Sequence, residues 1–582
     1  MDNHPIAQVF SEIADLLEIK GENVFKIRAY RSAADTINAW ADPVARMDET
    51  QLLDLPGIGK DLAKKIRELA DTGTCRFHQD LLLEFPPTIL DVLRLQGVGP
   101  KTVALLYSSL NIRSIEDLVE AAKAGRLREL KGMGPKKEAL ILKAVEEREK
   151  DRGRHLLSDT TAIAAELVAY LREHAPAAEF TPVGSLRRGC ETCGDIDILA
   201  TLDPALAPSG VEGSLMEQFV AFPRVDRILG QGDTKSSIRI IGGYQADLRL
   251  VPSDSRGAAM QYFTGSKAHN VSLRDRAIQH GYKLNEYGLF RVDDDSRVAG
   301  ETEEGIYEAL GMTWVPPELR ENRGEIDASI ARQLPRLVSA SDLRGDLHMH
   351  TDVTDGRDDL ETMAAAAQRL GYSYIAITDH SKALAMSNGL DERRALEHAA
   401  RIRELSGRLD GLTLLAGIEC DILADGTLDL ADDCLAQLDL VIASVHSQYG
   451  QGETQTTDRI LKAIECPWVD VLGHPMSRRL LQREPLKVNF DHIVSAAVAR
   501  GVVFEINCQP DRLDLSDAFA RLAHERGATI AISTDAHSTM ALGNMRWGVQ
   551  VARRAWLTPE SVLNARPFDE MRGMLRRHRR AA

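Results

Sequence analysis

The stretch that decides the fold is Val183-Gly184-Ser185-Leu186-Arg187-Arg188-Gly189, followed closely by Gly194-Asp195-Ile196-Asp197-Ile198-Leu199. In the second segment acidic and apolar residues alternate, which predicts a β-strand because neighbouring side chains of a strand point to opposite faces. Asp195 and Asp197 then share one face, and the isoleucines face the core. Two carboxylates this close repel each other unless cations lie between them. The stretch therefore predicts a strand that presents metal ligands.

A third carboxylate lies on a second alternating segment, Ala246-Asp247-Leu248-Arg249-Leu250-Val251, which follows a Gly-Gly turn. Three clustered carboxylates can hold two magnesium or manganese ions. Gly184 and Ser185 offer backbone and hydroxyl donors to a phosphate, and Arg188 offers a fork of N–H groups. An Asp-x-Asp pair alone is more typical of an exposed edge strand. Its combination with Gly-Ser and a later aspartate favours the metal site.

These motifs resemble those of the family X DNA polymerases, and the resemblance covers residues 1–315. It implies a DNA-directed DNA polymerase that adds dNTPs to gapped or nicked DNA in base excision repair, with magnesium or manganese in its nucleotidyltransferase palm. In that family, Gly-Ser-x-Arg-Arg-Gly and Gly-Asp-x-Asp bind nucleotide and metal. The residues implied for nucleotide binding are Gly184, Ser185, Arg188 and Gly194, and those implied for catalysis and metal binding are Asp195, Asp197 and Asp247.

The segment Tyr262-Phe263-Thr264-Gly265-Ser266 is similar to the part of the family that discriminates between sugars. Taken from the residues alone, its two aromatic side chains are expected in a core. The contacts that the resemblance implies are Tyr262, Phe263, Gly265 and Asn270 with the nucleotide, and Arg274 with the template strand.

Three Gly-x-Gly hairpins precede residue 150: Leu55-Pro56-Gly57-Ile58-Gly59-Lys60, Gln96-Gly97-Val98-Gly99-Pro100-Lys101 and Lys131-Gly132-Met133-Gly134-Pro135-Lys136. Apolar residues recur at helical spacing after each, which predicts helix, tight turn, helix. The free N–H groups of the second helix, with a lysine beside them, suit a phosphate. The repeats resemble helix-hairpin-helix motifs, which hold DNA by its backbone. The expected DNA-binding residues are Gly57, Gly59, Lys60, Gly97, Gly99, Lys101, Gly132, Gly134 and Lys136.

The N-terminal part also resembles the family's small domain that binds 5′-phosphates. There a lysine can form a Schiff base with an abasic sugar, and the resemblance places Lys65 at that position, which implies DNA lyase activity. Asp61 stands where the family has a basic residue, and this weakens the expected binding of a 5′-phosphate. The alternative, a solvated helix lysine in Lys64-Lys65, stays open.

Beyond residue 342, short apolar strands alternate with helices, which predicts a mainly parallel sheet closed as a barrel. In Asp346-Leu347-His348-Met349-His350 two imidazoles project from one face of a strand, although a polar edge strand gives the same pattern. Seven strands are expected, around Leu347, Ile375, Leu415, Ile442, Val471, Phe504 and Ile530. The candidate ligands at their C-terminal ends are His348, His350, Asp355, His380, Glu419, His446, His474, Asp535 and His537.

Imidazole and carboxylate ligands without thiolate suit zinc or manganese and do not separate the two. The set suffices for about three ions, with Glu419 as a bridge, and such centres favour phosphoester hydrolysis. These residues resemble the polymerase and histidinol phosphatase (PHP) domain, over residues 342–575. Bacterial and archaeal family X polymerases with this domain imply a manganese-dependent 3′–5′ exonuclease and, in some members, abasic-site cleavage. The alternative is a non-catalytic, metal-bound structural platform.

The expected architecture is a multidomain α/β and α+β chain with a distorted (βα)7 barrel at its C-terminal end. A charge-rich stretch from Pro316 to Arg323 reads as a linker. The expected domains are residues 1–82, a helical DNA- and 5′-phosphate-binding domain; 83–153, a fingers-like helix-hairpin-helix domain; 154–252, the palm; 253–317, a thumb that selects the nucleotide; 318–341, the linker; and 342–582, the PHP phosphoesterase.

The bulk composition agrees with several soluble modules. The 582 residues exceed one hydrophobic core, and the net charge of −16 excludes binding of nucleic acid through a uniformly basic surface. No signal peptide or membrane span is recognised, so a cytoplasmic protein whose seven cysteines are thiols is expected. The protein is also expected to be a monomer. The pair in Cys190-Glu191-Thr192-Cys193 is expected in a loop, with a redox or zinc site as the alternative. Arg478, Arg479 and Arg512 are candidates for substrate phosphates or for surface ion pairs.

Overall fold

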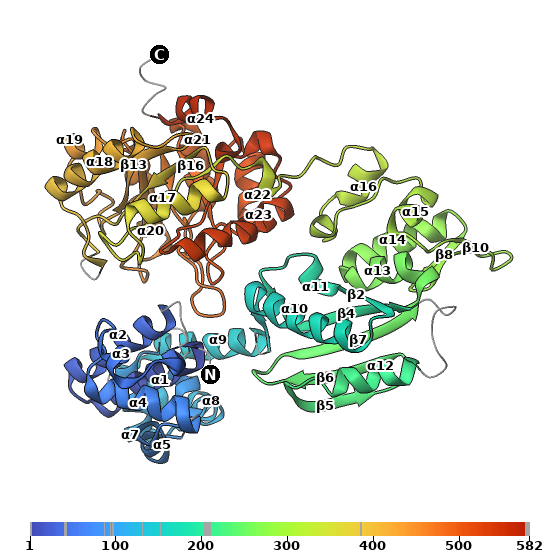
Figure 1. Cartoon of the computed structure of the whole chain (residues 1–582), viewed down its shortest axis with the longest axis horizontal. Coiled ribbons are helices and arrows are strands. Elements are labelled where there is room, and N and C mark those ends of the chain that lie inside the picture. Colours follow the sequence, from blue (N-terminus) through green and yellow to red (C-terminus); the bar gives the residue numbers. More distant parts are fainter. Residues whose placement is uncertain are drawn as a thin grey trace. The chain divides into compact units, whose positions relative to one another are not determined.

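The computed structural model describes residues 3–39, 44–86, 88–93, 95, 98–130, 132–151, 153–202, 211–384 and 387–576. The chain forms two compact units, Met1–Arg152 and Gly153–Ala582 (Figure 1). Within the described residues, none of the helices combines the length and the apolar character that a membrane span requires.

The first unit is built from helices around one apolar core. Its three hairpins repeat one turn, in which the residue between the glycines donates its N–H to the carbonyl three residues earlier, with N···O distances of 3.1, 3.0 and 3.0 Å for Ile58, Val98 and Met133. Gly57 and Gly132 have φ of +75° and +85°, a conformation that favours glycine. The helices are α1 (Asn3–Lys20), α2 (Val24–Ala39), α3 (Glu49–Leu53), α4 (Lys60–Thr72), α5 (Arg76–Glu84), α6 (Thr88–Leu93), α7 (Pro100–Leu110), α8 (Ile115–Lys123) and α9 (Pro135–Asp151), with 3-10 turns at Val44–Arg46 and Leu127–Glu129.

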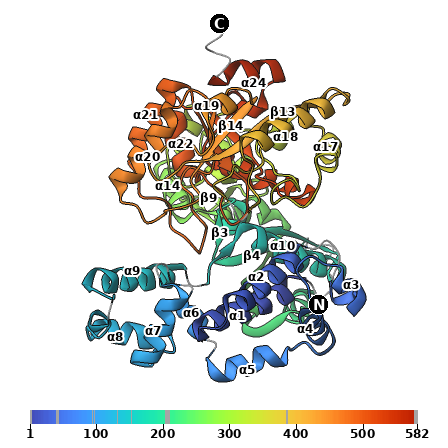
Figure 2. The same ribbon diagram turned by 90° about the vertical axis from the view of Figure 1, so that its left-hand side faces the viewer.

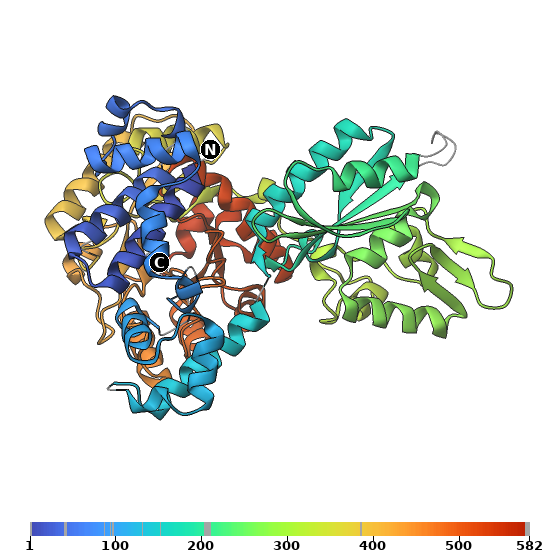
Figure 3. The same cartoon turned by 90° about the horizontal axis from the view of Figure 1, so that it is seen from below.

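A five-stranded mixed sheet with the order β2-β4-β7-β6-β5 follows in the second unit. Helices α10 and α12 pack on one face of it (Figure 3). Its strands are β2 (Ala178–Pro182), β4 (Asp195–Leu202), β5 (Val225–Gln231), β6 (Lys235–Ile240) and β7 (Gln245–Pro252); its helices are α10 (Leu157–His174), α11 (Gly184–Arg187) and α12 (Val211–Val220); and β1 (His155–Leu156) pairs separately with β3 (Thr192–Cys193).

A smaller module with its own apolar core comes next. It contains the helices α13 (Arg256–Thr264), α14 (Lys267–Gln279), α15 (Glu303–Ala309) and α16 (Glu325–Ile330), the 3-10 turns Ser253–Ser255 and Pro317–Leu319, and the antiparallel strands β8 (Tyr282–Asn285), β9 (Gly288–Arg291) and β10 (Arg297–Ala299).

The stretch from Pro316 to Arg323 is not an open linker, and that prediction was wrong. Arg320 is fully buried, where it donates to Val315 O at 2.9 Å and to Glu303 Oε1 at 2.6 Å. The charge of Arg320 is neutralised inside the module by Glu303, because a buried guanidinium is stable only when it is paired.

The C-terminal part is a parallel sheet of seven strands in sequential order, β11 to β17, surrounded by helices (Figure 2). A parallel bridge between Met349 and Ala536 links the two ends of the sheet, and this confirms the predicted barrel with its seven strand positions. The strands are buried on both faces, as parallel sheets usually are. They are β11 (Gly345–Asp346), β12 (Tyr374–Ile377), β13 (Thr413–Asp421), β14 (Leu440–Ser444), β15 (Val471–Leu472), β16 (Val503–Asn507) and β17 (Ile530–Ser533).

The helices around this barrel are amphipathic and place their apolar faces on the sheet. They are α17 (Leu360–Arg369), α18 (Glu392–Ser406), α19 (Asp432–Leu435), α20 (Glu453–Glu465), α21 (Phe490–Arg500), α22 (Asp517–Glu525), α23 (Met545–Arg554) and α24 (Phe568–Met574), with 3-10 turns at Ala340–Asp342, Thr539–Asn544, Pro559–Ser561 and Leu563–Ala565.

Candidate metal centres

The first centre is a cluster of three carboxylates on two adjacent strands. Asp195 and Asp197 lie two residues apart on β4, and Asp247 on β7 is the direct register partner of Asp197. One oxygen of each lies within 4.8 Å of the others. The alternation of the sequence places the pair on one face, and parallel pairing of β4 with β7 adds the third carboxylate.

The electrostatics of this cluster fit a cation. Burial, followed by repulsion from Asp195 and Asp247, raises the pKa of Asp197 to about 7. Among the described residues, the buried Oδ1 of Asp247 has no hydrogen-bond partner. Carboxylate oxygens that repel one another are the ligands that magnesium or manganese prefers.

The Gly-Ser segment begins helix α11 directly beside the carboxylates. Val183 N–H donates to Asp197 O at 2.8 Å, which fastens the loop to β4. Gly184 has φ of +64°, and a β-carbon there would overlap the carboxylate of Asp197. Glycine is therefore needed both for the backbone conformation and for the close approach.

A cavity of about 690 Å³ opens next to the cluster, within the range of ligand pockets. All the residues that the sequence implied for nucleotide binding line it. They are Gly184, Ser185, Arg188, Gly194, Tyr262, Phe263, Gly265 and Asn270, joined by Asp195, Asp197, Thr264 and Arg274.

The two aromatic residues are half-buried and line this cavity. Phe263 also packs against an apolar cluster that includes Val183 and Leu199, so the core position expected from the residues alone is met in part by Phe263 and not by Tyr262. Asn270 is oriented by two contacts: its Nδ2 donates to Tyr262 O at 2.7 Å, and its Oδ1 accepts from Gln261 Nε2 at 2.7 Å. Arg188 is held at the cavity edge, with Nη1 donating to Thr264 O at 2.6 Å.

Two cationic residues of the cavity were not identified from the sequence, Arg154 and Lys267. Arg154 is fixed by Thr192, to whose hydroxyl and carbonyl oxygens it donates at 2.8 and 2.6 Å. Lys267 is the first residue of α14. Neither belongs to a repeated motif, and only the tertiary fold brings them to the carboxylates.

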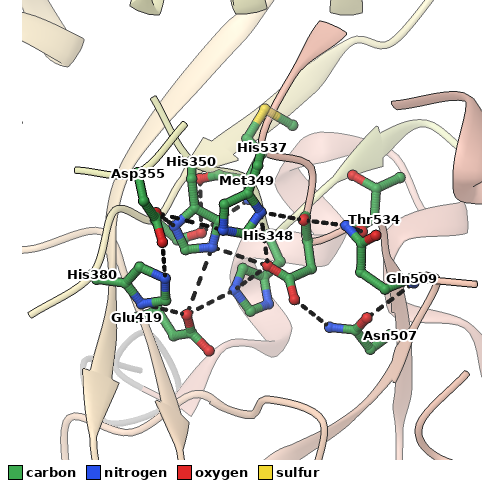
Figure 4. A network of polar contacts seen from close by, with 12 residues as sticks. His348, Met349, His350, Asp355, His380, Glu419, Asn507, Gln509, Thr534 and His537 are labelled. Atoms are coloured by element: carbon green, nitrogen blue, oxygen red, sulfur yellow. Dashed lines mark hydrogen bonds and ion pairs between the residues drawn. The ribbon is translucent and has the colours of Figure 1, made fainter. Parts of the chain in front are cut away.

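The second centre lies at the C-terminal rim of the barrel, where all nine predicted ligands come together. Figure 4 shows six of them, His348, His350, Asp355, His380, Glu419 and His537, around one point. Glu419 occupies the middle, with oxygens 2.9 Å from His380 Nδ1 and 3.0 Å from His474 Nε2. The groups whose ligand atoms lie within 4.8 Å of one another are His350, Asp355, His380 and His537; His348, His350 and Asp535; and His380, Glu419 and His446.

Burial and crowding perturb the titration of these side chains. Burial, followed by repulsion from His537 and His380, lowers the pKa of His350 to about 4. Burial alone would also lower the pKa of His380, but Glu419 and Asp355 outweigh it and raise that pKa to about 10. His350 Nδ1 is buried without a hydrogen-bond partner in the described part of the chain. Imidazoles and carboxylates that converge in this way fit divalent cations.

Buried partners that the sequence did not single out orient the ligands. Glu505 Oε1 lies 2.7 Å from His348 Nδ1, and Asp421 Oδ1 lies 3.1 Å from His446 Nδ1. Asn507 Nδ2 donates to Asp535 Oδ2 at 3.0 Å. Such contacts fix the orientation of ligand side chains. An acidic residue inside an apolar strand, as in Phe504–Ile506, was the signal that could have revealed Glu505.

The cavity over this centre measures about 540 Å³, and Arg357, Tyr449, Arg479 and Arg512 line its wall. Arg479 pairs with Asp511 at 2.8 Å. Arg478, also considered from the sequence, does not line this cavity; it pairs with Glu191 at 2.7 Å and donates to Leu513 O.

The remaining candidates lie in the first unit and in the Cys-x-x-Cys segment. Lys65 Nζ pairs with Asp61 at 2.6 Å and lies 5.2 Å from the centre of the Phe77 ring. The seven cysteines are free thiols, and Cys193 is buried in β3. Gly97 lies outside the described residues, whereas the lysines after the hairpins, Lys60, Lys101 and Lys136, are exposed.

Five family models match successive parts of the chain. They are a helix-hairpin-helix domain over residues 1–75, a SAM-like helix-hairpin-helix tandem over 89–147, a DNA polymerase beta palm over 158–230, a DNA polymerase beta thumb over 259–321 and a PHP domain over 346–509.

One relative matches from end to end. The DNA polymerase/3′-5′ exonuclease PolX of Bacillus subtilis (strain 168) is 34% identical over 581 residues, which cover 99% of this chain and 100% of the relative. A probable phosphatase of Thermoanaerobacter sp. (strain X514) is 28% identical over 232 residues, 38% of this chain and 89% of the relative. A probable phosphatase of Shewanella sp. (strain MR-4) is 27% identical over 233 residues, 38% and 88% of the two chains. The chain therefore belongs to the family X DNA polymerases that carry a C-terminal PHP domain.

Proposed function

We propose that this chain is a DNA-directed DNA polymerase that fills short gaps during DNA repair and trims 3′ ends with its PHP domain, a 3′–5′ exonuclease. The observation that carries the proposal is that one chain has two complete metal-ligand sets, three carboxylates in the palm and nine ligands in the barrel. The full-length similarity to the Bacillus polymerase/exonuclease supports the same pairing of activities.

In the palm, Asp195, Asp197 and Asp247 would hold magnesium or manganese. When bound, these ions favour deprotonation of the primer 3′-hydroxyl and neutralise the triphosphate. The side chain of Arg188 and the hydroxyl of Ser185 bind phosphate oxygens at the edge of the cavity.

The other cavity residues select and orient the substrates. The α13 residues Tyr262 and Phe263 flank the sugar, Asn270 meets the incoming base, and Arg274 contacts the template strand. Holding the triphosphate and the primer end in one geometry supplies much of the rate acceleration in nucleotidyl transfer.

In the barrel, the nine ligands would hold about three manganese or zinc ions, with Glu419 between them. Bound there, the ions polarise a phosphodiester and activate water for hydrolysis. Arg357 and Arg512 present guanidinium groups to the same cavity and bind the phosphates that flank the scissile bond. The same chemistry extends to cleavage at abasic sites.

The helical unit supplies affinity for gapped or nicked DNA through its three hairpins. We place the functional modules at residues 1–82, 83–153, 154–252, 253–330 and 342–582, in a monomer that works in the cytoplasm. The fourth module extends to residue 330 because Arg320 and α16 belong to it. Lyase chemistry at Lys65 needs a free amine nitrogen, so the ion pair with Asp61 has to open first.

The rival proposal, a structural PHP platform, is tested at Glu419. Glu419→Gln keeps the size of the side chain and removes the bridging charge. We expect the shortening of a 5′-labelled strand in manganese to fall at least about a hundredfold, while the circular-dichroism spectrum stays that of the folded wild type. Unchanged shortening by a folded variant would favour the structural platform.

A further inference from the structure

A chain of ion pairs joins the polymerase cavity to the PHP barrel. It runs from Arg188 through Glu321 to Arg554, the last residue of α23, and then to Asp517 and Arg323. Glu321 Oε1 lies 3.0 Å from Arg188 Nε and 3.0 Å from Arg554 Nη1. Asp517 Oδ2 lies 3.0 Å from Arg554 Nη2 and 2.9 Å from Arg323 Nη1. Arg554 and Asp517 are each only 7% exposed.

Arg554 reaches Arg188 in two ways. Its Nη1 donates to the carbonyl oxygen of Arg188 at 2.9 Å, and the same nitrogen donates to the carboxylate oxygen of Glu321 that accepts from Arg188 Nε. In addition, Gly189 packs so closely on α23 that a β-carbon would overlap the side chain of Gln550. The palm loop that carries Arg188 is thus docked on a helix of the barrel.

Glu321 is shared between two guanidinium groups. Burial alone would raise its pKa, but Arg188 and Arg554 outweigh burial and hold the pKa of this carboxyl below its usual range. A triphosphate that binds Arg188 has to compete with Glu321 for the guanidinium. Arg554 keeps the carboxylate neutralised during this exchange, which matters because an unpaired buried charge is costly.

We propose that Arg554 of the PHP domain is a positioning residue for dNTP binding in the palm. The inference rests on the proposed contact of Arg188 with the triphosphate. Loss of Arg554 is expected to weaken dNTP binding through two changes. The loop loses the donor that anchors the Arg188 carbonyl, and Glu321, left with Arg188 as its partner across the cavity edge, holds that guanidinium more strongly. Both weaken dNTP binding.

The test is steady-state incorporation of one dNTP into gapped DNA by the full-length protein. We expect Arg554→Met to raise the KM for dNTP about tenfold, with kcat within about twofold, because charged hydrogen bonds are lost. Arg554→Lys keeps the charge but not the full set of contacts, so its KM should lie between those of Arg554→Met and the wild type. Arg546→Ala, which removes an exposed arginine from the same helix, is the control. An unchanged KM in a folded Arg554→Met protein would overturn the inference.

Folding is monitored by the exonuclease activity of each preparation, which depends on the barrel. If Arg554→Met fails to fold, Arg554→Lys and Glu321→Gln carry the test. Glu321→Gln removes the competitor of the triphosphate, so the KM for dNTP should fall, opposite in sign to the effect of Arg554→Lys. A rise in KM with Glu321→Gln would contradict the proposed competition.

Two further variants separate this inference from the function on which it rests. Arg188→Ala should raise the KM for dNTP; an unchanged KM would remove the proposed role of Arg188 itself. In the Arg188→Ala background, Arg554→Met should raise the KM for dNTP by clearly less than it does alone, because the competition for the Arg188 guanidinium is absent and only the anchor of the residue-188 carbonyl is lost. If Arg554→Met raised KM about tenfold in that background too, Arg554 would act by another route and the inference would fall.

Discussion

The carboxyl group of Asp197 is a metal-ligand candidate whose ionised form is destabilised by its surroundings in the folded protein. Its pKa of about 7 comes from burial and from the repulsion of Asp195 and Asp247. Without a cation, the folded protein binds a proton between pH 3.8 and about 7 that the unfolded chain releases. The metal-free palm therefore loses stability as the pH rises through this window, and a divalent ion restores it.

This titration predicts the pH dependence of metal binding in the palm. Metal ions bind the ionised carboxylate, so protons compete with them below a pH of about 7. We expect the magnesium concentration for half-maximal primer extension to rise up to about tenfold per pH unit below that point and to level off above it. Extension assays over a series of magnesium concentrations at several pH values measure it. A half-maximal concentration that stayed constant from about pH 6 to about pH 8 would contradict the raised pKa.

Gly184 provides a second test at the level of one residue. An alanine there would have a strained φ of +64° and a β-carbon overlapping the Asp197 carboxylate. We expect Gly184→Ala to lower kcat/KM for extension at least about tenfold by displacing a metal ligand, and to leave strand shortening intact. Gly230→Ala in β5 of the same sheet, where no atom lies within 4 Å of an added β-carbon, is the matched control. Equal activities of the two variants would argue against this role of the loop.

Secondary-structure elements could be predicted from sequence wherever a short pattern controls them. Alternation located β4 and β7, and the apolar runs located the seven barrel strands. The stretch around Arg320 was misread because Arg320 is neutralised by Glu303 and donates to the carbonyl oxygen of Val315, partners that local sequence does not reveal. Helical spacing and strand alternation report burial, whereas they do not report which distant charges meet.

The three hairpins make a prediction about salt dependence. Each lysine that neutralises a DNA phosphate releases about one counterion. The triple variant Lys60→Ala/Lys101→Ala/Lys136→Ala should therefore reduce the slope of log Kd against log salt for gapped DNA by about three. Lys123→Ala, at the end of α8 and outside the three hairpin segments of the sequence, is the control. If the plot of log Kd against log salt for the triple variant coincided with that of the wild type, the affinity for DNA would come from residues other than these lysines.

The site residues, like the secondary-structure elements, include some that local sequence predicts and some that it does not. The nine barrel ligands and the three palm carboxylates are readable because parallel strands deliver their C-terminal ends to one rim, and alternation fixes the face. Arg154, Lys267 and Glu505 are not, because their roles depend on tertiary contacts. Arg554 is the extreme case, since it meets the carbonyl of Arg188 across 366 positions of sequence.

At the scale of the whole molecule, the barrel should depend on its ions for stability. Removal of metal leaves Glu419 and Asp535 buried among imidazoles whose charges must then balance them. We expect manganese to raise the thermal midpoint of the metal-stripped protein, because a ligand that binds only the folded state stabilises it. Calorimetry with and without the ion measures this shift. Glu419→Ala should lose most of it, and a wild-type midpoint that did not respond to manganese would count against a metal-filled barrel.

The central claim is that one chain contains two independent metal-dependent active sites. The most direct test is a gel assay of 5′-labelled gapped DNA in manganese, with and without dNTPs, that compares the wild type with Asp197→Ala and Glu419→Ala. We expect extension to disappear only in Asp197→Ala and shortening to disappear only in Glu419→Ala. Loss of both activities in either folded variant would contradict separate sites.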